Sequence, residues 1–139
     1  MRLSKAGVPL EDDEQIAFVQ WCRASGILVH HSPNEVSGST EAHKRRAAKM
    51  KRLGTSSGFP DLVVYIPVKG IDDEIYAYQM LAIEMKKKKG STTSKAQKEW
   101  LKVLEMAGIP SRVCKGCEEA IKFVEEIKKE IHGGDDELF

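Results

Sequence analysis

The apolar residues of the chain follow two different spacings, which predict where it forms helices and where it forms strands. A spacing of three and four residues predicts helices and occurs in three segments: residues 11–25, 94–107 and 117–131. Ser94 and Gly108 bound the second of these as N-cap and stop. Residues 40–53 predict a further, strongly basic helix that is closed by Gly54.

The strands are predicted from apolar runs bounded by turn residues. Residues 61–67 (DLVVYIP) are rich in β-branched side chains and nearly all apolar, which favours a central strand. A turn at residues 70–73 leads to a longer strand at 75–87, so a hairpin is the natural connection. Residues 27–31 and 111–114 predict two short strands.

The order of these elements, α β α β β α β α, predicts an α/β fold with a small mixed central sheet flanked by helices. A length of 139 residues suits one domain, which we expect to span residues 1–132, with residues 133–139 as an acidic flexible tail. No apolar run reaches the roughly 18 residues of a membrane span. The N-terminal segment lacks the apolar centre of a secretory signal. We therefore expect a cytoplasmic protein.

The chain has three cysteines, Cys22, Cys114 and Cys117. The last two form a C-x-x-C motif, but no second pair completes the four ligands of a structural zinc site. Free thiols in a reducing compartment are therefore the favoured interpretation.

The net charge of +1 (22 basic minus 21 acidic residues) hides two strongly basic segments. Residues 43–55 hold six lysines and arginines and no acid, and residues 86–98 hold six lysines and no acid. Such segments indicate either a solvated surface or contacts with a polyanion, and this density favours the DNA backbone. The residues that we expect to bind nucleic acid are Lys44, Arg45, Arg46, Lys49, Arg52, Lys87, Lys88 and Lys89.

An acidic residue, Glu84, interrupts the apolar run of the second hairpin strand. Strand periodicity places Glu84 and Lys86 on one face, about 7 Å apart. Asp61 begins the other hairpin strand, so its carboxylate could lie beside Glu84. Either acid alone could be a polar residue at a strand end. Two adjacent carboxylates repel unless a cation lies between them, and oxygen-only ligands suit Mg²⁺ or Mn²⁺ rather than zinc.

Three further polar residues fit such a site. Lys86 could orient or deprotonate a water molecule, or stabilise the charge of the transition state. Glu14 shares a helical stripe with Phe18, and Gln97 shares one with Leu104, so both polar side chains should face inward and need polar partners. By contrast, Trp21, Trp100, His30 and His31 are better explained by packing or solvent exposure than by a role in the site.

Three short motifs together resemble the VRR-NUC (virus-type replication-repair nuclease) branch of the PD-(D/E)xK nucleases. They are GFPDL at residues 58–62, IEMK at residues 83–86 and SKAQ at residues 94–97. The resemblance extends to the acidic first helix, to the HSPNE segment that holds Asn34 and Glu35, and to the last strand and helix. It implies a restriction-endonuclease-like core.

The resemblance also implies a site. Asp61 and Glu84 would bind a divalent metal together with the backbone carbonyl of Met85, and Lys86 would be the catalytic lysine. Gln97 would be the active-site residue of a helix. Glu14 would be the acid of the first helix, although four acids crowd residues 11–14 and only the stripe selects it.

We therefore expect a Mg²⁺- or Mn²⁺-dependent DNA endonuclease without a small-molecule cofactor or a membrane partner. Small stand-alone members of the family are similar to Holliday junction resolvases, which implies a homodimer that cuts branched DNA. The alternative is a non-catalytic module that binds nucleic acid through the same basic segments. A sequence-specific restriction enzyme is disfavoured because the chain is short and shows no separate recognition domain.

Overall fold

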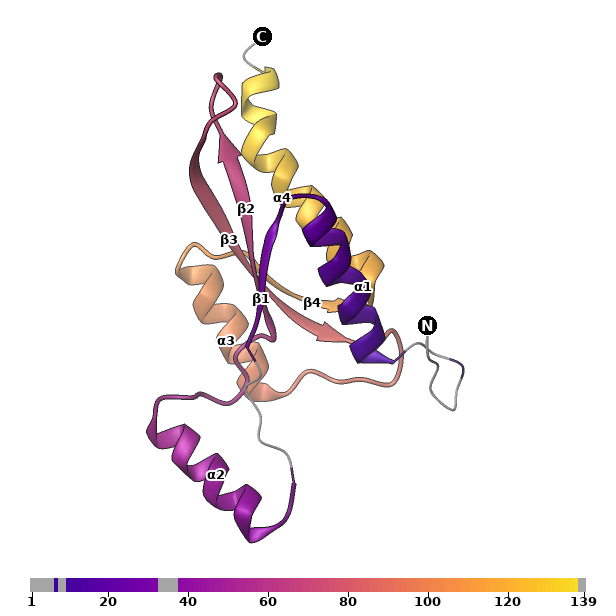
Figure 1. Ribbon diagram of the computed structural model, residues 1–139, viewed down its shortest axis with the longest axis vertical. Coiled ribbons are helices and arrows are strands. Elements are labelled where there is room, and N and C mark those ends of the chain that lie inside the picture. The colour runs from indigo at the N-terminus through magenta and orange to yellow at the C-terminus, as the bar shows by residue number, and fades with distance from the viewer. Residues whose placement is uncertain (1–6, 8–9, 33–37, 138–139) are drawn as a thin grey trace.

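The computed structural model describes residues 7, 10–32 and 38–137, and Figure 1 shows their arrangement. The described residues form a four-stranded sheet with helices on both faces. The strands are β1 (Leu28–His31), β2 (Leu62–Lys69), β3 (Ile75–Lys86) and β4 (Ser111–Lys115). The helices are α1 (Glu11–Ala24), α2 (Glu41–Arg52), α3 (Lys95–Met106) and α4 (Cys117–Glu137).

The sheet has the strand order β1-β2-β3-β4. The first three strands are antiparallel, and β4 is parallel to β3, so the sheet is mixed. A tight turn joins β2 to β3, in which Asp73 takes a positive φ of 64° and its N–H donates to the Gly70 carbonyl. The parallel step from β3 to β4 runs through α3, as a crossover connection requires.

The core lies between one face of the sheet and the helices α1 and α4, which pack side by side (Figure 1). Alternate residues of β2 and β3 point to this face, and Leu62, Val64, Leu81, Ile83 and Met85 are buried there. Helix α3 covers the opposite face, where Glu84 also points. Burial of these apolar residues fixes the pairing of β2 with β3, and this pairing in turn sets the positions of the polar residues on the opposite face.

Helix α2 stands away from this body and projects from one end of it (Figure 1). None of its residues is buried. Its first turn is stabilised by the Thr40 hydroxyl, which accepts a hydrogen bond from the His43 N–H. The helix thus presents its side chains to solvent rather than to the core.

The predicted element order and the α/β class with a small mixed sheet are confirmed. The last helix differs from the prediction, because α4 continues beyond Ile131 to Glu137 and so includes most of the segment expected to be a tail. Gly133 and Gly134 do not end it, since a glycine within a helix costs only about 1 kcal/mol. No helix in the described part of the chain has the length and apolar character to cross a membrane.

Candidate active site

The hairpin register places Asp61 beside Glu84. Leu62 pairs with Ile83, so the next position along the ladder sets Asp61 opposite Glu84 on the face that α3 covers. The two carboxyl groups are hydrogen-bonded to each other. Asp61 also accepts a hydrogen bond from the Met85 N–H to its Oδ2 atom at 3.2 Å. Both acids are therefore held by the edge of a rigid sheet.

Helix α3 supplies an amide to the same pair. The Gln97 side chain donates from Nε2 to Glu84 Oε1 at 2.9 Å, while its Oε1 accepts from the Ser94 N–H at 2.9 Å. The Ser94 hydroxyl completes a capping box by accepting from the Gln97 N–H. The Gln97 side chain thus has two roles: it caps the start of α3 together with Ser94, and it orients the Glu84 carboxylate.

Gly58 explains why a glycine precedes the Phe-Pro-Asp segment. It has a positive φ of 87°, and a Cβ atom there would lie only 2.6 Å from the Ala96 carbonyl carbon and 2.7 Å from the Gln97 nitrogen. Any larger residue would push the first turn of α3 away from the sheet. The glycine therefore allows Gln97 to reach Glu84.

Lys86 lies on the same face as Glu84, two positions further along β3. Its Nζ atom is 3.5 Å from Glu84 Oε1, and its side chain is only 15% exposed. Neither charged group can therefore be treated as a freely solvated surface residue.

The environment of the acids opposes their ionisation. Burial, followed by the negative charge of Asp61, raises the pKa of Glu84 to about 8. Burial also raises the pKa of Asp61, although the hydrogen bond from Glu84 acts in the opposite direction. Without a cation, the pair is thus expected to share a proton at neutral pH, with Glu84 as its carrier.

The donor set fits a hard divalent cation. In a strand, the N–H and C=O of one residue point to the same side. The Met85 carbonyl therefore faces the Asp61 side, where β2 has ended and offers no ladder partner. In the described part of the chain, no three His, Cys, Asp or Glu side chains are close enough to hold a metal. Two carboxylates and a carbonyl suffice for Mg²⁺, because this ion usually keeps several waters.

Two acids of α1 have different surroundings. Glu14 is buried, accepts a hydrogen bond from the Cys117 N–H at the start of α4, and lies 3.8 Å from Lys88 Nζ. Glu11 is more exposed, and its pKa is raised by burial and next by the charge of Asp61. Glu11 therefore lies near enough to Asp61 for the charge of Asp61 to act on it.

The helical stripe selects Glu14 in the sequence, while which of the four acids at residues 11–14 serves the site stays open. Both acids lie on the stripe that contains Phe18, at i+4 and i+7, so the stripe alone does not separate them. Glu11 differs from Glu14 in being the first residue of α1.

The structure gathers Asp61, Glu84, Met85, Lys86 and Gln97, and the Glu14 carboxylate lies at the N-terminus of α4. The role of Glu14 in the site stays a prediction. Lys87 lies near enough for its charge to act on Glu11. Asn34 and Glu35 lie outside the described residues. All three cysteines are free thiols, with Cys22 and Cys114 buried in the core.

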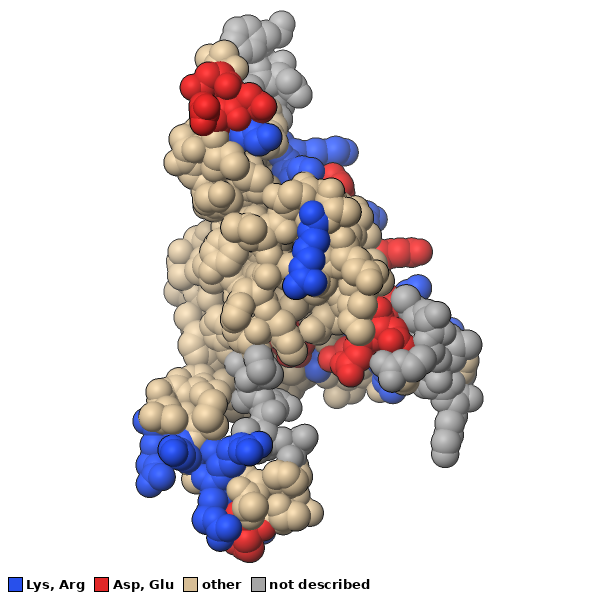
Figure 2. All heavy atoms as spheres, viewed as in Figure 1, with Lys and Arg blue, Asp and Glu red and all other residues tan. Residues whose placement is uncertain are grey.

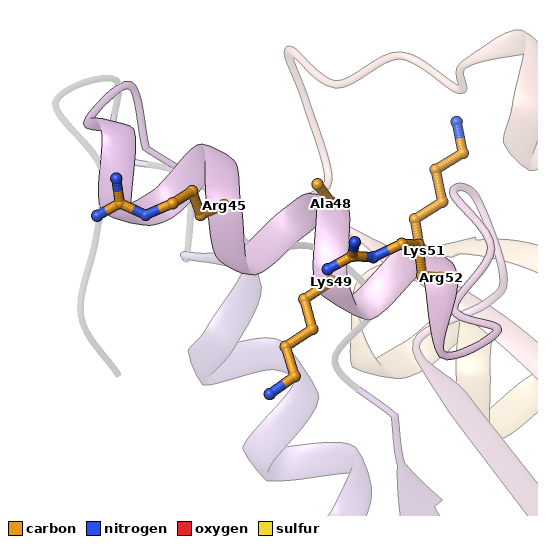
Figure 3. A pocket seen from close by; sticks show the side chains of 5 residues that line it. All are labelled: Arg45, Ala48, Lys49, Lys51 and Arg52. Carbon is orange, nitrogen blue, oxygen red and sulfur yellow. The ribbon is translucent and has the colours of Figure 1, made fainter.

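The basic side chains of α2 form a separate surface. Figure 2 shows lysine and arginine side chains gathered on this projecting helix. Arg45, Lys49 and Arg52 share a stripe at i, i+4 and i+7 and, with Ala48 and Lys51, line a hollow of about 720 Å³. Their cationic groups reach in different directions from the helix (Figure 3), so the surface offers several separate charges.

The comparisons with known proteins agree with this geometry. The VRR-NUC domain family matches residues 11–118, which include every residue of the site. The chain belongs to the VRR-NUC family. A solved structure titled "VRR_NUC domain protein" is similar at 28% identity with a TM-score of 0.61, over 85% of this chain and 87% of that one. A search of curated proteins gives no match.

The VRR-NUC match makes the chain a nuclease-type domain, and a nuclease domain implies binding of nucleic acid. The four-stranded mixed sheet with flanking helices is consistent with a PD-(D/E)xK-like core, as predicted.

Proposed function

We propose that this VRR-NUC domain is a Mg²⁺- or Mn²⁺-dependent endonuclease that hydrolyses phosphodiester bonds of branched DNA. The observation that carries the proposal is the Asp61–Glu84 pair, in which Glu84 is buried and Asp61 is half-buried, with Lys86 and Gln97 bound to Glu84. A structural role explains this cluster poorly, because placing two acids together in a poorly solvated position is costly even with Lys86 beside them.

Each residue of the pair's surroundings has a part in the proposed reaction. Asp61, Glu84 and the Met85 carbonyl would hold the divalent cation, which when bound supplies Lewis acidity and lowers the pKa of water. Gln97 keeps the Glu84 carboxylate oriented through its 2.9 Å hydrogen bond. Lys86 either takes a proton from the attacking water or stabilises the charge that develops on the phosphate. A pH–rate profile distinguishes these two roles.

The basic surfaces would bind the phosphate backbone. Arg45, Lys49 and Arg52 project from the body on α2, and Lys87 lies beside the site. Backbone contacts carry little sequence information, so selectivity would come from the shape of the DNA.

A homodimer would present two such sites to the two strands of a junction. The first half of β3 supports this part of the proposal, because β4 pairs only with residues 82–86 of that strand. Residues 75–78 therefore have a free edge within the described structure, and Tyr76 and Tyr78 are 71% and 50% exposed. Uncovered apolar edges of this kind favour pairing with another chain. Light scattering, with Tyr76→Lys as the variant, tests this part.

The test of the function is a cleavage panel. Labelled four-way junctions, flaps, linear duplexes and single strands are incubated with the protein and Mg²⁺, Mn²⁺ or EDTA. We expect metal-dependent cleavage of branched substrates, and loss of cleavage in Glu84→Ala with DNA binding in EDTA unchanged. Binding without metal-dependent cleavage would instead support a non-catalytic binding module.

A further inference from the structure

A second hollow lies next to the acid pair on the side of the sheet edge. It has a volume of about 570 Å³, within the range of small-molecule sites. His30 lines it from the end of β1, Thr55 and Ser56 from the loop after α2, and Phe59 and Trp100 from the loop before β2 and from α3. We call this hollow the Trp100 groove.

The Trp100 groove adjoins the Asp61–Glu84 pair. Phe59 is only two residues before Asp61, a distance of about 7 Å along an extended chain. Ser32 also lines the groove, and its N–H donates to the Asp61 carbonyl at 2.8 Å. A nucleotide that neighbours a phosphate at the acid pair can therefore reach the groove.

The lining suits a flat heterocycle with polar edges. Phe59 and Trp100 form an edge-to-face pair with centroids 5.2 Å apart, and both rings are partly exposed. Thr55 and Ser56 contribute hydroxyl groups and His30 an imidazole, so donors and acceptors surround the aromatic surface. Among the residues that the structure describes, no carboxylate lines the groove. Nucleobases combine a π face with such edges and bind to protein aromatic rings by stacking.

The other tryptophan has a different environment. Trp21 packs against Phe18 in a stacked arrangement with centroids 6.0 Å apart, on the side of α1 and the core. Its position accounts for a packing role, whereas the ring of Trp100 borders an open hollow.

We propose that the Trp100 groove binds an unpaired nucleobase of the DNA strand whose phosphate lies at Asp61 and Glu84. This inference rests on the proposed function and narrows its substrate class to DNA with an unstacked nucleotide beside the cut. A base within a duplex is paired and stacked on both sides, and removing it from the stack is costly. A branch point supplies such a base at lower cost, which gives a physical reason for a preference for branched DNA.

The experiment uses Trp100 as its own reporter. The chain has two tryptophans, so a Trp21→Phe variant leaves Trp100 as the sole indole. This variant is titrated in EDTA with three DNAs: a flap with an unpaired nucleotide at the branch, the same flap with an abasic residue there, and a fully paired duplex. We expect the first to change the Trp100 emission and to bind roughly 5- to 100-fold more tightly than the abasic flap, as for one base–aromatic stack.

Substitutions in the groove sharpen this result. His30→Ala and Thr55→Val lie on its rim rather than in the core, and each should reduce the difference between intact and abasic flaps. Glu99→Ala is the matched control, because Glu99 lines a different hollow that also includes Trp100 and does not line the Trp100 groove. This control should leave the difference unchanged.

Equal affinity for intact and abasic flaps, or an unchanged Trp100 emission on binding, would overturn the proposal. Because the titration contains no metal, it does not depend on cleavage. A protein that cleaves both flaps equally would keep its nuclease function and lose only the groove, whereas one that discriminates between them without ever cleaving would keep the groove alone.

Discussion

The two basic segments of this chain look alike in sequence and differ in structure. Each holds a dense run of cations without an acid between them. In the structure, Lys86 is largely buried beside Glu84, and Lys88 lies 3.8 Å from the buried Glu14. On α2 no residue is buried, and within the described residues Lys44 is the only cation of the helix in an ion pair.

The two segments differ because the fold brings acidic residues such as Asp61 and Glu14 to the lysines of residues 86–89. Strand β3 carries Lys86 into an edge where Asp61 and Glu84 already lie, so its charge acts on acids in a poorly solvated environment. Within the described part of the chain, α2 packs against no buried acid, and its charges remain available to a polyanion. The same local composition thus supports chemistry in one place and binding in the other.

The largest effect is expected from Lys86→Met. Removing this cation should lower the rate of cleavage by roughly 10²- to 10³-fold, because it acts on charge that develops in the transition state. DNA affinity in EDTA should remain within a few-fold of the wild type. Lys98→Met is the matched control at an exposed position of the same segment, and a similar loss there would abolish the distinction within this segment.

The next largest effect is expected from the triple variant Arg45→Ala, Lys49→Ala and Arg52→Ala. Loss of three phosphate contacts should weaken binding and reduce the slope of log K against log salt by up to about 2.7, or about 0.9 for each contact. Fluorescence anisotropy at several salt concentrations measures both quantities. Two exposed lysines of α4, Lys122 and Lys129, serve as controls, and their substitution should leave the slope unchanged.

The free energy of unfolding should depend on pH through Glu84, which distinguishes this acid from the exposed cations of α2. Because the pKa of Glu84 is raised from 4.5 to about 8 in the fold, folding favours its protonated form. The free energy of unfolding in EDTA should therefore decrease as pH rises from about 4.5 to about 8, relative to Glu84→Gln, which cannot titrate. Urea unfolding across this range measures the difference. A difference between the two proteins that does not change with pH would contradict the assignment.

The smallest effects concern Glu14 and Lys88. Glu14→Ala leaves the Cys117 N–H without its acceptor and should destabilise the fold by about 1–3 kcal/mol. Lys88→Ala removes only a partly exposed ion pair and should cost less than about 1 kcal/mol. Denaturant titration gives both values. A loss of cleavage without loss of stability in Glu14→Ala would instead place Glu14 in the site.

Local patterns predicted the fold and most of the candidate site. The spacing of apolar residues and the breakers at Gly54 and Gly108 were sufficient for the element order. The hairpin then fixed the register of Asp61 against Glu84, because a strand has only two faces.

Non-local contacts could not be predicted in this way. The contact of Gly58 with the first turn of α3 depends on how a loop meets a helix across the sheet edge. The hydrogen bond from the Cys117 N–H to Glu14 depends on where α4 begins, 103 residues further along the chain. The Trp100 groove joins residues from β1, the loop after α2 and α3, and their convergence has no periodic signature.

The most direct test of the central claim is single-turnover cleavage of a branched DNA with enzyme in large excess. Wild type, Lys86→Met and the triple variant of α2 are compared in Mg²⁺ at rising enzyme concentration. At saturation the triple variant should cut within a few-fold of the wild-type rate, because its defect lies in binding, whereas Lys86→Met should remain roughly 10²- to 10³-fold slower. The account would be contradicted if Lys86→Met cut at the wild-type rate at saturation, or if the triple variant stayed inactive at saturating enzyme.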